Sequence, residues 1–428
     1  MEQSGDGVML LISSGRRAYR EYLMKGLAER VPLWLIDNSP PTWQSEHIVG
    51  HSVVKLRNQS RFEPDDEALA QAAADVARER PILGVCSYDE GFVIATADIA
   101  QRLGVPGLSP EGADGVRNKH RTRSVLTAAG LLQPQFALAH SLEEAAAAAE
   151  RIGYPVVLKP RGMGASVGVV GVAHADELAA AFALAARAGH AGPPDFERGL
   201  LVEEMAQGVE ISIDGAVVGG EFRTFFAAHK RFAPPPYFEE IGHMADGDDP
   251  LAKDTELIGM IAEAHRALGV VDGMTHTEVK LTSRGPLIIE VNGRLAGDLL
   301  PYAVKWATGL DAGHVAADVA MGKSPDLTPV HPGAAGVRFL YPPEDCRILD
   351  ISLPEPGVVP GLVEVGPLAK PGTEVYLPPT AHLSRYGYMI ATADTLEEVD
   401  SRLDEATTLA SVQYEPLKPS ESGPERLF

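Results

Sequence analysis

The chain has 428 residues, 45% hydrophobic and 22% charged, as in an ordinary globular protein. Its formal net charge of −22 at pH 7 argues against nucleic acid or an anionic membrane surface as a partner, because both repel an acidic surface. The two cysteines, Cys86 and Cys346, lie far apart, which favours a reducing cytoplasm over a disulfide framework. No segment approaches the roughly 20 apolar residues of a membrane helix. We therefore expect a cytoplasmic protein.

The first part of the chain alternates short apolar runs with amphipathic segments. Residues 8–13 predict a strand, residues 18–30 carry apolar side chains at helical spacing, and residues 31–37 predict a second strand. Three more elements are expected here: a helix at 67–80, a strand at 81–88 and a helix at 89–104. Strand, helix and strand in succession begin a doubly wound α/β domain, which we expect at residues 1–115.

A second unit is expected at residues 116–204. Its predicted elements are helices at 118–130, 141–153 and 176–189 and strands at 154–160, 167–173 and 198–206. Ser141 and Glu144 have the spacing of a capping box, which marks the start of the second of these helices.

The third unit is expected at residues 205–428. Its predicted elements are a helix at 257–269, strands at 275–283 and 285–293, and a helix at 299–311. From about residue 331 the pattern changes to short strands and turns, with a last helix at 395–410. The third unit therefore ends in a β-rich module.

The predicted strand at 154–160 carries Lys159 near its end and is followed by a loop of small residues. The loop contains Gly162, Gly164, Ala165, Ser166 and Gly168. Small residues let backbone N–H groups approach a phosphate, and lysine supplies a positive charge. The GxxxxGK[ST] motif of a P-loop is absent. Such a loop alone is more often a plain hairpin, and the lysine ahead of it favours a nucleotide.

Two neighbouring predicted strands carry a set of oxygen ligands. Glu290 and Asn292 lie two residues apart, on the same side of one strand, and a short turn would bring Glu278 beside Glu290. Carboxylate and amide oxygens suit Mg²⁺. An exposed polar strand face is the alternative, but Glu290 follows an apolar run, where an unpaired carboxylate is costly. Arg294 has the same parity and could clamp a phosphoryl oxygen.

A third group of carboxylates follows an apolar strand. Glu203 and Glu204 end the predicted strand at 198–206, and Glu210 follows after a break. Taken alone, this pattern is typical of a solvated strand end. With a phosphate loop upstream, the backbone and Glu203 could supply an edge for adenine, and Glu210 a contact for ribose.

The order of these segments resembles the ATP-grasp superfamily. The segments are NK at 118–119, LKP with its glycine-rich loop, VEE followed by GVEIS, and TEVK followed by IIEVNGR. Each is weak alone, but their order and spacing over roughly residues 8–400 are specific. The chain is most similar to the L-amino-acid ligases, which make dipeptides and carry stretches like 235–246 and 290–311. The resemblance implies an ATP-grasp fold of α/β and α+β lobes.

The resemblance also implies how ATP is bound. The residues it assigns are Lys119 and Lys159 for the phosphates, Gly162, Gly164, Ala165, Ser166 and Gly168 for a loop that closes over them, Glu203, Glu204, Met205 and Ala206 for adenine at the hinge, and Glu210 for ribose. Met163 and Ala165 stand where serines or glycines are common in the family, which leaves the side-chain contacts of the loop open.

Further residues match the reacting end of the family's site. The implied Mg²⁺ ligands are Glu278, Glu290 and Asn292. Arg294 matches the arginine that steadies the acyl phosphate. His243 is placed on the substrate side, although a lone histidine is more often structural. Lys230 is placed near the γ-phosphate or the acid substrate.

The implied activity is an ATP-dependent ligation. A carboxylate, expected to be an amino acid, is activated as an acyl phosphate and joined to an amine, with release of ADP and phosphate. ATP and two Mg²⁺ ions are expected, with Mn²⁺ able to substitute, and the partners are small molecules with a homodimer as the assembly. Two alternatives stay open: a biotin-carboxylase-like or purine-biosynthesis ligase, and an inactive nucleotide-binding regulatory protein.

Overall fold

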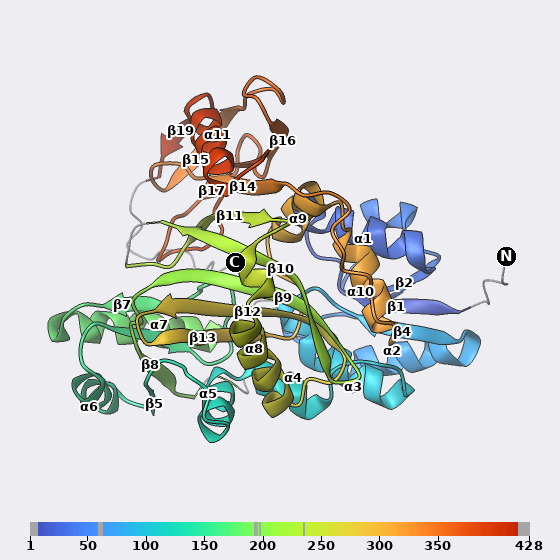
Figure 1. The fold of residues 1–428 in the computed structure, drawn as a ribbon, viewed down its shortest axis with the longest axis horizontal. Coiled ribbons are helices and arrows are strands. Elements are labelled where there is room, and N and C mark those ends of the chain that lie inside the picture. The colour runs from blue at the N-terminus through green and yellow to red at the C-terminus, as the bar shows by residue number, and fades with distance from the viewer. Residues whose placement is uncertain (1–6, 59–62, 192–195, 197, 234–235, 418–428) are drawn as a thin grey trace.

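The computed structural model describes residues 7–417 apart from 59–62, 192–195, 197 and 234–235 (Figure 1). The helices are α1 (Arg17–Arg30), α2 (Asp66–Glu79), α3 (Val93–Leu103), α4 (Pro110–Arg117), α5 (Lys119–Ala128), α6 (Leu142–Ile152), α7 (Leu178–Ala191), α8 (Thr255–Leu268), α9 (Leu300–Thr308), α10 (Ala312–Ala320) and α11 (Leu396–Thr408). Short 3-10 turns are η1 (Trp43–Glu46), η2 (Glu90–Phe92), η3 (Ala175–Glu177) and η5 (Pro250–Lys253).

The strands form four sheets. In the first half of the chain they are β1 (Val8–Ile12), β2 (Leu33–Asp37), β3 (Gly50–Val53), β4 (Ile82–Cys86), β5 (Phe136–Ala139), β6 (Val156–Pro160), β7 (Val170–Val172), β8 (Leu200–Glu204) and β9 (Val209–Val218). In the second half they are β10 (Glu221–Phe232), β11 (Glu240–Asp246), β12 (Gly273–Thr282), β13 (Gly285–Asn292), β14 (Ala334–Leu340), β15 (Cys346–Ser352), β16 (Leu362–Pro367), β17 (Glu374–Val375), β18 (Gly387–Ala393) and β19 (Ser411–Pro416).

The N-terminal sheet is parallel, with strand order β3-β2-β1-β4. Alternate side chains of β1 point to opposite faces, as the pleat of a strand requires. Met9 and Leu11 pack in the core that holds α1, whereas Leu10 and Ile12 pack in the core that holds α2 and α3. Helices therefore cover both faces, and the doubly wound α/β fold predicted for this part is confirmed.

The middle lobe has an antiparallel sheet of order β5-β8-β6-β7 (green in Figure 1) and a core of its own with α6 and α7. Helix α6 begins at the predicted cap, where Ser141 Oγ accepts a hydrogen bond from the backbone N–H of Glu144. The carboxylate of Glu144 accepts from the backbone N–H of His140 rather than from that of Ser141. The helix start is therefore as predicted, with the second bond shifted by one residue.

The largest sheet is antiparallel, with order β13-β12-β9-β10-β11-β14-β18-β16. Because β11 pairs with β14, the predicted β-rich module continues the sheet that begins with β9, and β15, β17 and β19 form a small sheet beside it. Strand β10 was not predicted. Phe225 to Ala228 are all buried, Phe226 against the core of α1 and Ala227 against that of α8, so the strand lacks the alternation of a half-exposed one.

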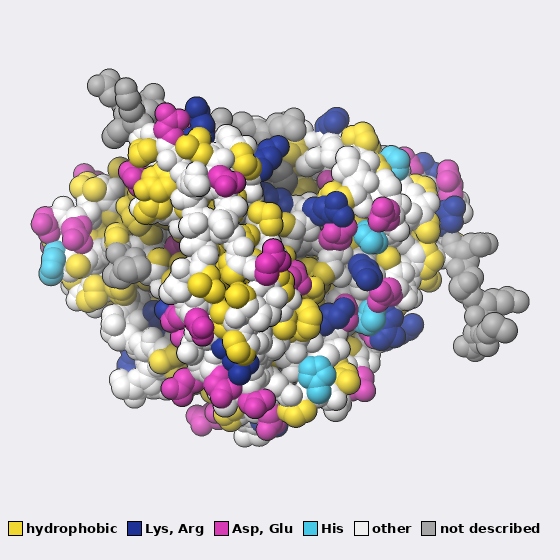
Figure 2. Space-filling view, turned by 90° about the horizontal axis from the view of Figure 1, so that it is seen from above, with side chains coloured by type: hydrophobic (Ala, Val, Ile, Leu, Met, Phe, Trp, Pro, Cys, Tyr) yellow, Lys and Arg dark blue, Asp and Glu magenta, His cyan; other side chains and the backbone are white. Residues whose placement is uncertain are grey.

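Charged side chains of both signs are mixed on the surface. On the face shown in Figure 2, lysine and arginine side chains are scattered among acidic ones instead of forming one basic patch. Among the described residues, no helix is long and apolar enough to cross a membrane. The predicted boundaries at residues 115 and 204 stay predictions.

Helices α1 and α10 meet at two glycines. A Cβ atom on Gly313 would lie 2.6 Å from the carbonyl oxygen of Leu23 and 2.8 Å from the Cα of Gly26. This contact joins the N-terminal domain to the large sheet, because α10 shares one hydrophobic core with β1 and with Ala216 of β9. The two parts are held together by backbone-to-backbone packing that leaves no room for a side chain.

Replacing Gly313 with alanine should therefore destabilise the protein by about 1–3 kcal/mol through overpacking. Gly259 is the control, since it lies in α8 with nothing within 4 Å of an added Cβ. Alanine at Gly259 should stabilise by about 0.5–1 kcal/mol. Thermal unfolding of the two variants should show midpoint shifts of opposite sign, and an unchanged midpoint for Gly313→Ala would contradict the packing argument.

Candidate active site

A cleft of about 820 Å³ opens where the carboxyl ends of β1, β2 and β4, the middle lobe and the large sheet meet. The predicted residues that line it are Lys119, Lys159, Gly162, Gly164, Ala165, Ser166, Glu203, Glu204, Met205, Ala206, Glu210, Glu278, Glu290, Asn292 and Arg294. Gly168, Lys230 and His243 lie outside the lining. Gly168 is close-packed, because an added Cβ would meet Ala188 at 2.4 Å and Pro160 at 2.8 Å.

The expected metal ligands lie side by side on β12 and β13. Glu278 pairs with Glu290 across the two strands, and His276 pairs with Asn292. Each carboxylate uses Oε1 in an ion pair: Glu278 with Lys230 at 2.7 Å, and Glu290 with Lys119 at 2.9 Å. Two carboxylates and an amide are thus gathered on the cleft wall, and this hard oxygen donor set fits Mg²⁺.

Lys230 lies beneath these carboxylates, with only 1% of its side chain exposed. Its Nζ is 2.7 Å from Oε1 of Glu240, 2.7 Å from Oε1 of Glu278 and 3.5 Å from Oε1 of Glu210. Burial alone would lower the pKa of Lys230, but the three carboxylates raise it well above its usual value. The ammonium therefore stays charged and fixes acids from three strands at one point.

The carboxyl groups around Lys230 differ in their pKa values. Burial would raise the pKa of Glu278, but Lys230 and His276 hold it well below the usual range. The pKa of Glu210 is raised, because burial and the charges of Glu278 and Glu240 outweigh the attraction of Lys230 and Lys280. Of Glu210 and Glu278, Glu278 is therefore the carboxylate that is held more firmly in its ionised form.

His276 lies between two carboxylates. Its Nδ1 is 2.6 Å from Oδ2 of Asp214, and its Nε2 is 3.4 Å from Oε1 of Glu278. Burial alone would lower the pKa of His276, but the charge of Asp214 and hydrogen bonds to both carboxylates raise it to about 9. The imidazole is thus a cation at neutral pH.

The glycine-rich loop is held against the cleft by two cations. Lys119 Nζ donates to the carbonyl oxygen of Met163 at 2.6 Å, and Arg117 donates to that of Gly162 at 3.0 Å. Ala165 and Ser166 have φ values of +52° and +57°, which are unusual for non-glycine residues. The loop thus presents its backbone to the cleft in a conformation that its small residues tolerate.

Glu203 lies differently from the expectation of an adenine contact. Its buried carboxylate is 2.6 Å from Nε of Arg123 and 2.9 Å from Nζ of Lys159. Burial would raise the pKa of Glu203, but these two cations lower it to about 2. Because both partners are cations, the side chain of Glu203 orients Lys159. This leaves the backbone of Met205 and Ala206 as the expected adenine edge.

Glu90, which the sequence analysis missed, joins two arginines in the cleft. Its carboxylate is 2.6 Å from Nε of Arg294 and 2.7 Å from Nη1 of Arg117. Burial would raise the pKa of Glu90, but Arg294, Arg117 and Lys119 lower it to about 2. Glu90 follows β4 at the carboxyl end of a parallel strand, where α/β domains bind their ligands, so its position in the sequence could have predicted a place in the site.

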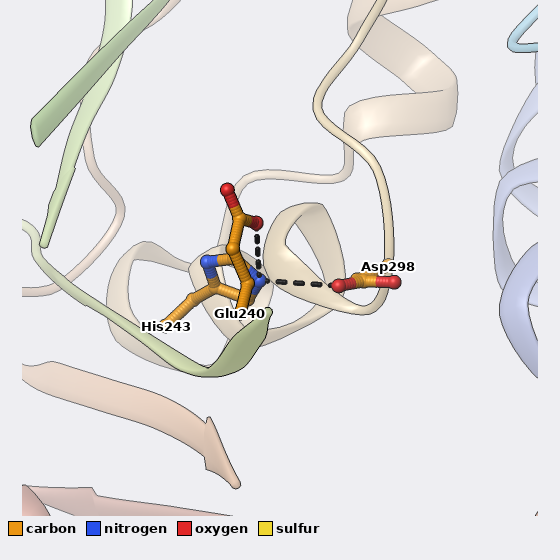
Figure 3. A group of neighbouring side chains, drawn as sticks. All are labelled: Glu240, His243 and Asp298. Atoms are coloured by element: carbon orange, nitrogen blue, oxygen red, sulfur yellow. Dashed lines mark hydrogen bonds and ion pairs between the residues drawn. The ribbon is translucent and has the colours of Figure 1, made fainter. Parts of the chain in front are cut away.

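His243 belongs to a cluster at the edge of the cleft. Figure 3 shows its Nε2 between two carboxylates, 3.4 Å from Glu240 and 3.2 Å from Asp298. These three side chains could surround a metal ion. However, Arg385 donates to both oxygens of Asp298 at 2.7 and 2.9 Å, so a guanidinium already balances this charge. The group is a hydrogen-bonded polar cluster beside the cleft.

Replacing His276 with glutamine should remove a pH-dependent part of the stability. The folded protein holds a proton on His276 that the unfolded chain releases near pH 6.5, so this stabilisation is complete below about pH 6.5. It is lost as the pH rises towards 9, at up to about 1.4 kcal/mol per pH unit.

Unfolding midpoints measured between pH 6 and 9.5 should therefore converge for the wild type and His276→Gln as the pH rises. The exposed His331 is the control, since His331→Gln should track the wild type throughout. A constant offset between His276→Gln and the wild type over this range would show that His276 does not hold the extra proton.

Comparison with known proteins agrees with this geometry. Residues 152–301 match the family description of the ATP-grasp domain, and residues 338–415 match the L-amino acid ligase C-terminal domain 2. The alanine–anticapsin ligase of Bacillus subtilis (strain 168) is 27% identical over 325 residues, which are 72% of this chain and 67% of that protein. Carnosine synthase 1 of Homo sapiens is 25% identical over 349 residues, 77% of this chain and 42% of that longer protein.

The crystal structure of the L-amino acid ligase from Bacillus licheniformis has the same fold. It superposes with a TM-score of 0.78 at 23% identity, and the match covers 96% of this chain and 100% of that chain. The ATP-grasp fold predicted from the order of the motifs is confirmed. The chain therefore carries an ATP-grasp domain at residues 152–301 and the C-terminal domain 2 of the L-amino acid ligases at residues 338–415.

Proposed function

We propose that this protein joins an amino acid, through its carboxylate, to an amine. The observation that carries the proposal is the convergence in one cleft of the oxygen ligands on β12 and β13, the glycine-rich loop and three cations, Lys119, Lys159 and Arg294. A related protein is named for ligating alanine to anticapsin and another for making carnosine, which supports an amino acid as one substrate.

Glu278, Glu290 and Asn292 would hold Mg²⁺, with two ions and replacement by Mn²⁺ as part of the proposal. Bound there, the metal supplies positive charge that balances the triphosphate. Fixed positive charges of the chain act in the same place, since Lys119 and Lys159 line the cleft. Lys119 is paired with Glu290 and Lys159 with Glu203. The phosphates of ATP would either replace these carboxylates as partners of the lysines or bind the lysines beside them.

The proposed reaction has two steps. An oxygen of the acid attacks the γ-phosphorus, the bond to the β,γ-bridging oxygen breaks, and ADP leaves. The amine nitrogen then attacks the acyl carbon, phosphate leaves and the amine loses a proton. Arg294 lines the cleft two residues after Asn292 and is oriented by Glu90, a position suited to steady the acyl phosphate.

The surroundings of the reaction complete the proposal. The adenine would lie at the hinge against Met205 and Ala206, with its ribose near Glu210. We also propose that the protein is a homodimer and that it is located in the cytoplasm. The two free cysteines fit the reducing conditions of that compartment. Small molecules are the expected substrates, because the cleft volume is that of a small-molecule site.

Phosphate release should require both ATP and an amino acid, with ADP and a condensed product in equal amounts. The test is a screen of single acids and acid–amine pairs, followed by mass spectrometry of the products. Stoichiometric AMP would contradict the acyl-phosphate route. Stimulation by bicarbonate and biotin, with none by amino acids, would favour the carboxylase alternative.

Replacing Glu290 with glutamine should lower kcat by about a hundredfold or more, since a charge that holds the metal is lost. Near-normal turnover at saturating Mg²⁺ would refute this metal assignment. Glu398→Gln, at the start of α11 with 52% of the native side chain exposed, is the control and should turn over like the wild type.

A further inference from the structure

The C-terminal module reaches the cleft with one short loop. His382 and Leu383, between β17 and β18, are both part of the cleft lining. Leu383 keeps 37% of its surface exposed, so an apolar isobutyl group faces the space where small molecules would bind. An exposed leucine in the lining of a cleft is a candidate contact for an apolar group of a substrate.

The backbone at Leu383 is strained. Its φ of +56° lies in the left-handed region. For a residue that has a Cβ atom, this conformation costs roughly 1–2 kcal/mol relative to an ordinary one. Such a conformation persists only where the surroundings enforce it. The loop therefore holds Leu383 in place against its own preference.

Glu239 is one of two residues that hold the backbone of Leu383 in this conformation. Its buried carboxylate accepts a hydrogen bond from the backbone N–H of Leu383 at 2.8 Å and one from Tyr341 Oη at 2.7 Å, and lies 3.1 Å from Nδ1 of His382. Because these bonds are charge-assisted, they are stronger than neutral ones. The backbone of Leu383 is thus tied directly to the segment that leads into β11.

Arg385 is the second residue that holds the loop in place. It is bound to both oxygens of Asp298, donates to Tyr341 Oη at 2.7 Å, and lies over the ring of Phe339, 3.6 Å from its centre. Its side chain is fully buried. The loop is therefore fixed on both sides of Leu383, and by residues of the large sheet.

The position of the loop along the cleft follows from a chain of contacts. Glu239 is followed by Glu240, which pairs with Lys230, and Lys230 pairs with Glu278 of the proposed metal site. Leu383 is thus connected to the metal end of the cleft, whereas the hinge at Met205 and Ala206 forms another part of the lining. The acid substrate must place its carboxylate at the metal end, because that group attacks the γ-phosphate.

We propose that Leu383 limits the size of the side chain of the acid substrate, and that Glu239 and Arg385 are positioning residues for it. The inference rests on the proposed function and adds the specificity of the same site. The substrate class is an amino acid whose side chain meets an apolar wall that ends the pocket.

The test replaces Leu383 with glycine, which adopts positive φ without strain, so the variant should fold at least as well as the wild type. The readout is kcat/KM for phosphate release with alanine, leucine and phenylalanine as the acid and one saturating amine. The ratio of the bulky acids to alanine should rise about tenfold, since a pocket discriminates by roughly that factor per methylene. Glu239→Gln should shift the same ratio in the same direction.

Leu349→Ala is the matched control, because Leu349 lies in the same module with 51% of its surface exposed and outside the cleft lining. It should leave the ratio unchanged. A second series varies the amine with alanine as the acid.

An unchanged acid ratio in Leu383→Gly, or a change confined to the amine series, would overturn the inference while the proposed function stands. If the wild type releases no phosphate with any amino acid, the proposed function fails and the inference with it.

Discussion

The buried ammonium of Lys230 is the interaction on which the site depends. It holds Glu210, Glu240 and Glu278 from three strands at one point, and without it these carboxylates would repel one another and take up protons. His276 and Lys280 add two further cations beside Glu278 and Glu210, so the carboxylates of this cluster are closely paired before any metal binds. A protein with a net charge of −22 can bind an anionic nucleotide only where metal ions and basic side chains are gathered, and the Lys230 cluster holds one of the proposed metal ligands, Glu278.

The cations of the cleft are themselves held by carboxylates. Lys119 pairs with Glu290, Lys159 with Glu203 and Arg294 with Glu90. Each pair fixes a flexible side chain before any substrate arrives, so less conformational entropy is lost when a phosphate binds. The same pairing balances each of the three positive charges with a carboxylate. The cleft is therefore preorganised for anions although the protein is acidic.

The pattern of residues alone predicted the part of the site that a hairpin brings together, whereas Lys119, Lys230 and the hinge residues were assigned by the resemblance. Glu278 faces Glu290 because a two-residue period and a short turn determine the register of a hairpin. Arg123 and Arg385 could not be found this way, since their partners Glu203 and Asp298 lie 80 and 87 residues away and only the packed fold joins them. Strand β10 was missed because its buried centre shows no period. The doubly wound start, in contrast, follows from strong local patterns.

The two-glycine contact between α1 and α10 bears on how the cleft can open. The N-terminal domain and the large sheet share one hydrophobic core across this contact, while the middle lobe packs around a core of its own. Separating the first two would expose apolar surface and break backbone packing, whereas rotating the middle lobe would keep both cores intact. If the cleft closes on a substrate, the middle lobe is therefore the part that can rotate without breaking either core. A graft that exchanges the middle lobe would need to match its hinge and also the groups that bind Arg117, Lys119 and Arg123.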